Sequence, residues 1–247
     1  MKIFRKLLVQ IIGVEKYLRL ISRIYVGLVL RGFLKKSYKE LFFLKELVKP
    51  GFYCLDIGAN LGYYSTMLSK IVGETGKVIA VEPIPMFCKI LKKNVKMSHR
   101  DNVEIYNFAL GDKNEVVKMG TPERGGVFRH GLTKLVESSD DNYARFYEVE
   151  MKKPDELFGN LNRLDFVKCD VEGYEHFVFE NMTAVIEKFK PVIQVELNGD
   201  ENRQKVISVL GGLGYKPHYL NQNKQLVLAD NKIIDNPKSD FYFLYIN

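Results

Sequence analysis

The stretch Leu55-Asp56-Ile57-Gly58-Ala59-Asn60-Leu61-Gly62 decides the fold of this 247-residue chain. It follows a short apolar segment that begins at Tyr53 and precedes a helix-like segment, so it predicts the turn between a first strand and a first helix. Gly58 and Gly62 let the backbone approach a ligand closely, because neither residue has a Cβ atom. Asp56 places a carboxylate just before the turn. The stretch therefore predicts a ligand-binding loop at the edge of a parallel sheet.

The spacing of the glycines separates two classes of cofactor. A dinucleotide loop reads GxGxxG and holds pyrophosphate at a helix N-terminus, whereas this chain reads DxGxxxG from Asp56 to Gly62. A carboxylate here would repel pyrophosphate and suit a ligand with an ammonium and a sulfonium group. The loop therefore favours S-adenosylmethionine, and an NAD-dependent dehydrogenase is the weakest interpretation.

Polar residues after the next two predicted strands extend this site. Glu82 ends the second strand and is expected to accept hydrogen bonds from both hydroxyls of a ribose, each worth about 1.5–3 kcal/mol. Asn107 follows the third strand, where polar and flat apolar groups are expected to face an adenine ring. The predicted cofactor-binding residues are Asp56, Gly58, Asn60, Gly62, Glu82, Pro83, Asn107, Ala109 and Asp170.

Short β-branched segments alternate with helix-like segments after the turn at Pro50-Gly51. Strands are predicted at residues 53–57, 77–82, 103–108, 165–171, 191–197, 226–229 and 241–246. This alternation implies a mostly parallel sheet with helices on both faces. Near the C-terminus, residues 214–220, 226–229 and 241–246 follow one another without helices, so an antiparallel edge is expected. Residues 121–147 show no regular pattern and are interpreted as a long loop.

The positive charge is concentrated at the N-terminus. The chain has 37 Lys or Arg and 30 Asp or Glu, a net charge of +7, and residues 1–49 hold twelve of the basic and three of the acidic residues. The rest therefore carries −2 and has no broad positive field that would recruit an anionic partner. We predict an arm over residues 1–48 and a main domain over residues 49–247. The composition, 46% hydrophobic and 27% charged, is globular and excludes a disordered chain.

The arm is predicted to form a basic amphipathic helix over residues 3–30. On a helical wheel, apolar residues share one face and basic residues the opposite one. The apolar face is Phe4, Leu7, Leu8, Ile11, Val14, Leu18, Ile21 and Tyr25, and the basic face is Arg5, Lys16, Arg19 and Arg23. Its charge-free runs are shorter than the roughly 18 residues that a membrane span needs. Two interpretations stay open: a helix or substrate lid packed on the domain, or peripheral contact with the inner membrane surface.

The three cysteines, Cys54, Cys88 and Cys169, are odd in number and lack CxxC spacing. They predict neither a disulfide framework nor a zinc site, so a reducing, cytoplasmic setting is expected. The sequence does not indicate an oligomeric state.

The segment Phe166-Val167-Lys168-Cys169-Asp170-Val171-Glu172-Gly173-Tyr174-Glu175 resembles the K-x-D-x-E-G-x-E signature of FkbM-type methyltransferases, which are class I S-adenosylmethionine-dependent enzymes. The resemblance covers residues 49–219 and also rests on residues 56–62, 81–83 and 107–112. It implies an α/β, Rossmann-like, seven-stranded and mostly parallel sheet of order 3-2-1-4-5-7-6, in which strand 7 is antiparallel. It also implies O-methylation of a hydroxyl on a small molecule, saccharide or glycan.

The acidic residues of this signature are the candidate catalytic groups. Asp170 and Glu172 are two residues apart at a strand end, so they are expected to point to the same side. An alcohol needs a base or a metal to remove its proton. The predicted catalytic residues are Asp170, Glu172, Glu175, His130 and Glu196, of which Asp170, Glu172 and Glu196 are also the candidate ligands of a divalent metal. Metal dependence is not the favoured interpretation.

Other roles stay open for these residues and for the chain. Glu175 is also suited to stabilise a helix N-terminus, Glu196 to form a structural ion pair and His130 to lie solvated in a loop. The first alternative function is an RNA methyltransferase that holds the phosphate backbone with its basic arm, although the acidic main domain disfavours a nucleic-acid partner. The second is a non-catalytic module that binds S-adenosylmethionine.

Overall fold

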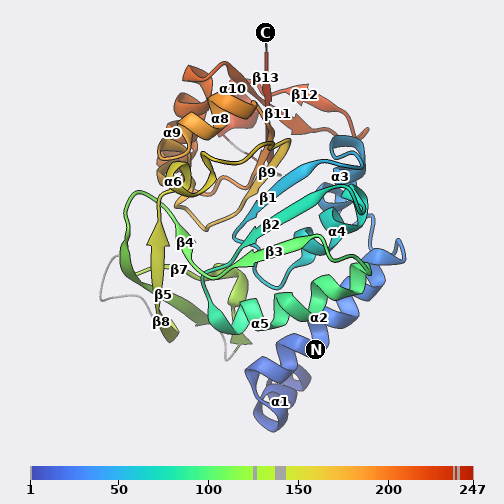
Figure 1. Cartoon of the computed structure of the whole chain (residues 1–247). Helices are drawn as coiled ribbons and strands as arrows, with labels where there is room; N and C mark the ends of the chain where they lie inside the picture. The colour runs from blue at the N-terminus through green and yellow to red at the C-terminus, as the bar shows by residue number, and fades with distance from the viewer. Residues whose placement is uncertain (1, 125–126, 137–142, 236, 238–239, 247) are drawn as a thin grey trace.

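A twisted sheet of eight strands forms the centre of the structure, a computed structural model that describes residues 2–124, 127–136, 143–235, 237 and 240–246 (Figure 1). The strand order is β12-β11-β13-β10-β9-β1-β2-β3. The strands are β1 (Tyr53–Ile57), β2 (Lys77–Val81), β3 (Val103–Tyr106), β9 (Phe166–Cys169), β10 (Val192–Val195), β11 (Tyr215–Leu220), β12 (Leu226–Leu228) and β13 (Phe241–Tyr245).

This order confirms the predicted topology. β3, β2, β1, β9, β10, β13 and β11 take the places of strands 3-2-1-4-5-7-6. The first five of these strands are parallel, and β13 runs antiparallel to both of its neighbours. β12 adds an eighth strand beside β11, beyond the seven that were expected.

Helices cover both faces of the sheet. They are α1 (Lys2–Ile12), α2 (Val14–Leu30), α3 (Lys39–Leu47), α4 (Tyr63–Val72), α5 (Pro85–Asn94), α6 (Pro154–Phe158), α7 (Glu175–Glu180), α8 (Thr183–Phe189), α9 (Asp200–Gly212) and α10 (Asn231–Asp235), with short 3₁₀ turns η1 (Val95–Ser98) and η2 (His130–Leu132). Alternate residues of β1 pack into different cores, because successive side chains of a strand point to opposite faces. Cys54 packs with residues of α3 and α4, and Leu55 with residues of α7, α8 and α9.

A second, smaller sheet is built from residues between β3 and β9. Its strands are β4 (Ala109–Leu110), β5 (Glu115–Arg124), β6 (Val127–Phe128), β7 (Lys134–Leu135) and β8 (Tyr143–Lys152). β5 and β8 form a long antiparallel ladder, and the order is β4-β8-β5-β6 with β7 beside β5. The interpretation of residues 121–147 as one irregular loop was therefore wrong. Gly120 and Pro122 interrupt the strand pattern, although Met119 and Thr121 point into the interior.

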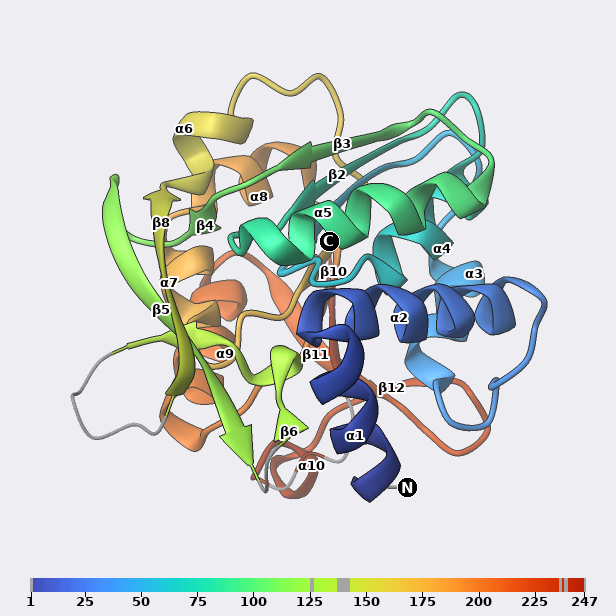
Figure 2. The ribbon, with the colours of Figure 1, turned by 90° about the horizontal axis from the view of Figure 1, so that it is seen from below.

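The N-terminal segment forms two helices rather than the single helix predicted. Gly13, at φ +80°, separates α1 from α2. α2 buries Tyr17, Leu18 and Val26, and its Ser22 Oγ accepts a hydrogen bond of 2.9 Å from Asn94 Nδ2 of α5. Figure 2 shows α2 lying alongside α5, with α1 leaving its end towards β6. None of the helices in the described ranges is long and apolar enough to cross a membrane. A domain boundary near residue 48 stays a prediction.

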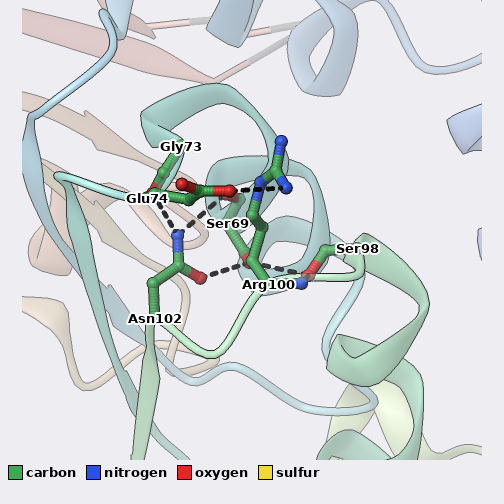
Figure 3. A network of polar contacts seen from close by, with 6 residues as sticks. All are labelled: Ser69, Gly73, Glu74, Ser98, Arg100 and Asn102. Atoms are coloured by element: carbon green, nitrogen blue, oxygen red, sulfur yellow. Dashed lines mark hydrogen bonds and ion pairs between the residues drawn. The ribbon is translucent and has the colours of Figure 1, made fainter.

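A polar network ties the end of α4 to η1 and to the start of β3 (Figure 3). Asn102 Nδ2 donates to the carbonyl oxygens of Ser69 and Gly73, at 3.0 and 2.7 Å. Ser69 Oγ in turn lies 2.8 Å from Ser98 Oγ, and Arg100 pairs with Glu74 at 3.3 Å. The network therefore holds η1 in a fixed position against α4.

Candidate active site

A cavity lies where β1, β2 and β9 end, enclosed on its other side by the second sheet. Its volume is about 750 Å³, counting the open mouth. The carboxyl ends of parallel strands are the usual ligand site in such sheets. The residues that line it include Gly58, Asn60, Glu82, Pro83, Phe108, Ala109, Met119, His130, Thr133, Leu135, Met151, Asp170, Glu172 and Tyr174.

The two glycines of the first loop have different tasks. Gly58 lines the cavity at φ +77°, and a Cβ atom there would lie 1.9 Å from the carbonyl oxygen of Asp170. The sequence predicted that the backbone at Gly58 approaches a ligand closely, and in the structure it also approaches the backbone of Asp170 closely. Gly62 does not line the cavity. It begins α4 at φ +84°, and its missing Cβ leaves room for Leu91.

Glu82 is held rigidly at the cavity wall, where the sequence placed it. Its Oε2 accepts a hydrogen bond from the Asn60 backbone N–H and its Oε1 from the Ile84 N–H, both at 2.8 Å. Burial raises the pKa of Glu82 to about 7, although these two hydrogen bonds lower it. Each carboxylate oxygen keeps a further lone pair, which is free to accept from a ligand hydroxyl.

Asp56 does not face the cavity, contrary to the prediction for this residue. Strand alternation points its side chain towards α4, where its Oδ2 accepts a hydrogen bond of 2.5 Å from Ser65 Oγ. Burial raises its pKa to about 6. Asp56 therefore joins β1 to α4 behind the binding loop.

The other residues predicted after the second and third strands have two different roles: Asn107 supports the backbone, whereas Pro83 and Ala109 line the cavity. Asn107 is exposed and does not line the cavity; its Nδ2 donates to the carbonyl oxygens of Glu82 and Pro83, at 2.9 and 2.7 Å. It thereby fixes the turn that carries Glu82. Pro83 and Ala109 line the cavity as predicted, next to the ring of Phe108.

Asp170 and Glu172 both line the cavity, although β9 ends at Cys169 and the backbone at Glu172 does not have the extended conformation on which their prediction rested. Burial raises the pKa of Asp170, and the charge of Lys168 opposes this shift. Burial also raises the pKa of Glu172 to about 8, and the neighbouring charge of Asp170 adds to the effect. Glu172 adopts φ +53°, a conformation that costs energy for a residue with a side chain.

Glu175 supports this strained turn and does not line the cavity. Its carboxylate accepts hydrogen bonds from the backbone N–H groups of Val171 and Gly173 and, at 2.6 Å, from Asn202 Nδ2. Because these bonds bracket Glu172, Glu175 acts as a positioning residue. The catalytic role predicted for it is not what this geometry indicates.

His130 faces the cavity from η2, on the side of the second sheet. Its Nδ1 lies 3.0 Å from Asn60 Oδ1. An amide oxygen only accepts, so in this pairing Nδ1 carries the proton and Nε2 keeps a free lone pair. Burial lowers the pKa of His130 to about 4, and the charge of Arg5 lowers it further.

Glu196 is exposed and lies outside the cavity lining. Its Oε1 accepts a long hydrogen bond, 3.4 Å, from Asn198 Nδ2. The three candidate metal ligands Asp170, Glu172 and Glu196 therefore do not form a set. In the described ranges, no three His, Cys, Asp or Glu residues are grouped so that they could hold a metal ion.

Sequence reasoning missed the residues that the second sheet contributes. Met119, Thr133, Leu135 and Met151 line the cavity from β5, β7 and β8 and the turn before β7. The signal in the sequence is the alternation of apolar and charged residues through β5 and β8, which extends beyond residues 121–147 on both sides. Tyr174, part of the recognised signature, also lines the cavity, and its hydroxyl donates to Asp112 Oδ1 at 2.7 Å.

The lysine of the signature lies beneath the acidic residues. Lys168 is 2% exposed, and its Nζ lies 3.1 Å from Asp240 Oδ2, which also accepts a bond of 2.7 Å from Gln194 Nε2. Burial opposes the charge on Lys168, but Asp240 and Asp170 hold its pKa well above the usual value. A buried positive charge thus offsets the carboxylates at the end of β9.

These residues fit S-adenosylmethionine. Glu82 has lone pairs for ribose hydroxyls, and the buried walls of Phe108 and Ala109 match a flat ring. The carboxylate of Asp170, which lines the cavity, matches the ammonium and sulfonium groups. Asp56, by contrast, does not line the cavity and supports the binding loop through its hydrogen bond with Ser65.

Comparisons with known proteins agree with this fit. A protein-L-isoaspartate O-methyltransferase of Caenorhabditis elegans is 22% identical over 148 residues, 58% of this chain and 65% of that protein. A probable cobalt-precorrin-6B C(15)-methyltransferase (decarboxylating) of Sulfolobus acidocaldarius is 34% identical over 103 residues, 42% of this chain and 52% of that protein. The chain thus matches less than two thirds of the length of these relatives.

A crystal structure of methyltransferase FkbM from Methylobacillus flagellatus KT superposes with a TM-score of 0.47 at 12% identity, and covers 80% of this chain and 48% of that one. Residues 56–222 match the methyltransferase FkbM domain, which is more than half of the sequence and spans β1 to β11. The chain therefore belongs to the FkbM family of S-adenosylmethionine-dependent methyltransferases.

Proposed function

We propose that this protein transfers the methyl group of S-adenosylmethionine to a hydroxyl oxygen of a small molecule or saccharide. The observation that carries the proposal is that two proton acceptors, Glu172 and His130, line the same cavity as Glu82. Glu172 follows β9 of the main sheet, and His130 belongs to η2 beside the second sheet. A hydroxyl group bound between Glu172 and His130 would therefore have a base beside it to take up its proton.

The reaction requires the chain to align the acceptor and to take up its proton. S-adenosylmethionine, when bound, supplies a methyl group on a positively charged sulfur. Because the transfer is an in-line displacement, orientation contributes much of the rate. Glu172 is the stronger of the two bases, since burial raises its pKa to about 8 whereas that of His130 is lowered to about 4. A base whose pKa lies near the working pH is the more effective catalyst.

The lining favours a neutral acceptor. Met119, Leu135 and Met151 provide apolar walls, and Thr133 adds a hydroxyl among them. Such a surface suits the carbon faces of a sugar or a small ring, with few polar groups to fix its orientation. None of the described lining residues is Lys or Arg, which makes an RNA backbone a poorer fit than a neutral hydroxyl compound.

The proposal is tested by methyl release from S-adenosylmethionine with a panel of saccharides and hydroxylated small molecules. We expect Glu172→Gln to lower turnover about a hundredfold or more, as for loss of a general base, while cofactor binding measured by titration calorimetry persists. In the wild type, kcat/KM for the cofactor is expected to rise with pH up to about 8, because Glu172 must lose its proton.

Glu187→Gln is the control, since Glu187 is the same residue type but is exposed on α8 and lies outside the cavity lining. It is expected to retain wild-type turnover. A rising limb near pH 4 instead of 8 would transfer the role of base to His130. Cofactor binding without methyl release on any acceptor would contradict the transferase and support a binding module.

A further inference from the structure

The outward face of α2 carries an apolar stripe that no described residue covers. Leu20, Ile21, Ile24 and Leu28 are 46%, 40%, 52% and 36% exposed. Three of them recur every fourth residue, so they form one row along the helix. The opposite side of α2 is already anchored to the domain through Leu18. The stripe is therefore separate from the face with which α2 packs on the domain.

Exposed apolar side chains are concentrated in this part of the molecule. Of the fourteen large exposed ones on described residues, eight belong to the first 38 residues of the chain. Besides the stripe, these are Leu7, Ile11, Phe33 and Tyr38. Single exposed apolar residues are ordinary, but a concentration of them marks an interaction surface.

A basic groove runs directly beside the stripe, between α2 and η1. Its cationic lining residues are Arg23, Arg31, Lys70, Lys93 and Lys96, and no Asp or Glu lines it among the described residues. None of these five forms an ion pair within the described ranges. Arg23 and Arg31 each follow a stripe residue by three positions, which places charge and apolar surface on one face.

The walls of the groove are fixed. Lys70 Nζ donates to the carbonyl oxygen of Leu30 at 3.3 Å, and Arg31 Nη1 donates to that of Gly27 at 3.2 Å. On the far side, the network drawn in Figure 3 holds η1, which carries Lys96, against α4. Two of the five cations, and the backbone of η1 that carries Lys96, are therefore held in place.

We propose that this face docks on a membrane surface containing anionic lipids. The stripe enters the headgroup region, and the basic groove binds lipid phosphates. An amphipathic helix at an interface combines these two contributions, apolar burial and attraction of Lys and Arg to anionic lipid. The pairing of the two features on one helix is what the proposal rests on, independently of the methyl acceptor.

The charges argue against the other occupants. In a symmetric dimer through this face, each groove would meet the same face of its partner, so like charges would be brought together. A single-stranded nucleic acid would use the cations but leave the aliphatic stripe exposed, since bases stack on aromatic side chains. A lipid surface satisfies both.

The test is co-sedimentation of the full chain with vesicles of phosphatidylcholine alone and of phosphatidylcholine mixed with phosphatidylglycerol. We expect binding to the anionic vesicles that weakens with added salt. Ile24→Ser with Leu28→Ser is expected to weaken it at least about tenfold. Lys93→Gln with Lys96→Gln is expected to weaken it about tenfold, with no change in the response to neutral vesicles.

Matched controls come from exposed residues elsewhere. Leu228→Ser of β12, 52% exposed in the wild type, and Lys216→Gln of β11 are expected to bind like the wild type, and thermal unfolding checks that every variant folds. Equal binding of the stripe variant and the wild type would overturn the proposal. The proposal would also be overturned if the wild type did not bind vesicles but formed dimers that are lost in the stripe variant. Stronger binding to an RNA homopolymer than to anionic vesicles at the same salt would overturn it as well.

Discussion

The absence of a side chain at position 58 is the strictest single-residue requirement of the site. A Cβ atom would lie 1.9 Å from one backbone atom of Asp170 and 2.9 Å from another, at φ +77°. We expect Gly58→Ala to lower the free energy of unfolding by about 3 kcal/mol and to abolish cofactor binding, because the ends of β1 and β9 must move apart. Urea unfolding and titration calorimetry measure both effects.

Gly211→Ala is the control for that substitution. Gly211 lies in α9, and its added Cβ has no neighbour within 4 Å. We expect it to be stabilising by up to about 1 kcal/mol, since alanine favours a helix interior. A Gly58 variant as stable as this control would show that the close approach is not required.

The carboxylates at the end of β9 predict how stability changes with pH. The pKa of Glu172 is raised to about 8, so the folded state binds its proton more tightly than the unfolded chain does. The contribution of Glu172 to the free energy of unfolding is therefore greatest at low pH and is lost as the pH rises towards 8. We expect Glu172→Gln, which cannot ionise, to become more stable than the wild type as the pH is raised from 5 to 8.5.

Urea unfolding at several pH values measures this difference. Glu187→Gln controls for the loss of one carboxylate, because Glu187 is exposed on α8 and does not line the cavity. Parallel stability curves for the wild type and Glu172→Gln would contradict the raised pKa.

At the scale of elements, a buried ion pair joins β9 to Asp240, the residue just before β13. Lys168 is 2% and the Asp240 side chain 12% exposed, with 3.1 Å between the charged atoms. We expect Asp240→Asn to lower the free energy of unfolding by about 3–5 kcal/mol, because it leaves a buried charge without its counter-ion. Chemical denaturation measures the loss.

An exposed pair provides the comparison. Lys113 and Glu115 lie 2.8 Å apart but are 46% and 52% exposed, so Glu115→Gln is expected to leave the free energy of unfolding nearly unchanged. Lys168→Met combined with Asp240→Asn is expected to recover part of the lost stability. Equal effects of Asp240→Asn and Glu115→Gln would mean that burial does not strengthen the inner pair.

The elements differ in how far the sequence predicts them. Strands of the main sheet are short, apolar and buried on both faces, so β1, β2 and β9 are visible as apolar runs, and the resemblance supplies their order. The second sheet is half exposed, with charged residues such as Lys118 on its outer face, and this hides its strands. Side-chain direction is harder still. Asp56 and Glu175 belong to recognised motifs, yet both point away from the cavity because of their partners Ser65 and Asn202.

At the scale of the whole molecule, the N-terminal helices reach the candidate active site. Arg5 of α1 donates to the carbonyl oxygen of Phe128 at 3.4 Å, and its charge lowers the pKa of His130. We expect Arg5→Gln to raise that pKa from about 4, although it stays below the ordinary value because burial is the larger cause.

Titration of the His130 ring signals by NMR measures the change, with Lys6→Gln as the control. Lys6 is an exposed neighbour on the same helix. An unchanged His130 pKa in Arg5→Gln would show that α1 does not influence the cavity electrostatically.

The position of β13 also determines when the molecule can be completed during synthesis. β13 is translated after β11 and β12, yet it lies between β10 and β11. Until residues 241–245 have left the ribosome, β10 ends the parallel part of the sheet with an open edge, and Lys168 has no Asp240. The sheet is therefore completed only after β13 has been synthesised, and a nascent chain that lacks β13 exposes two strand edges to its neighbours on a polysome.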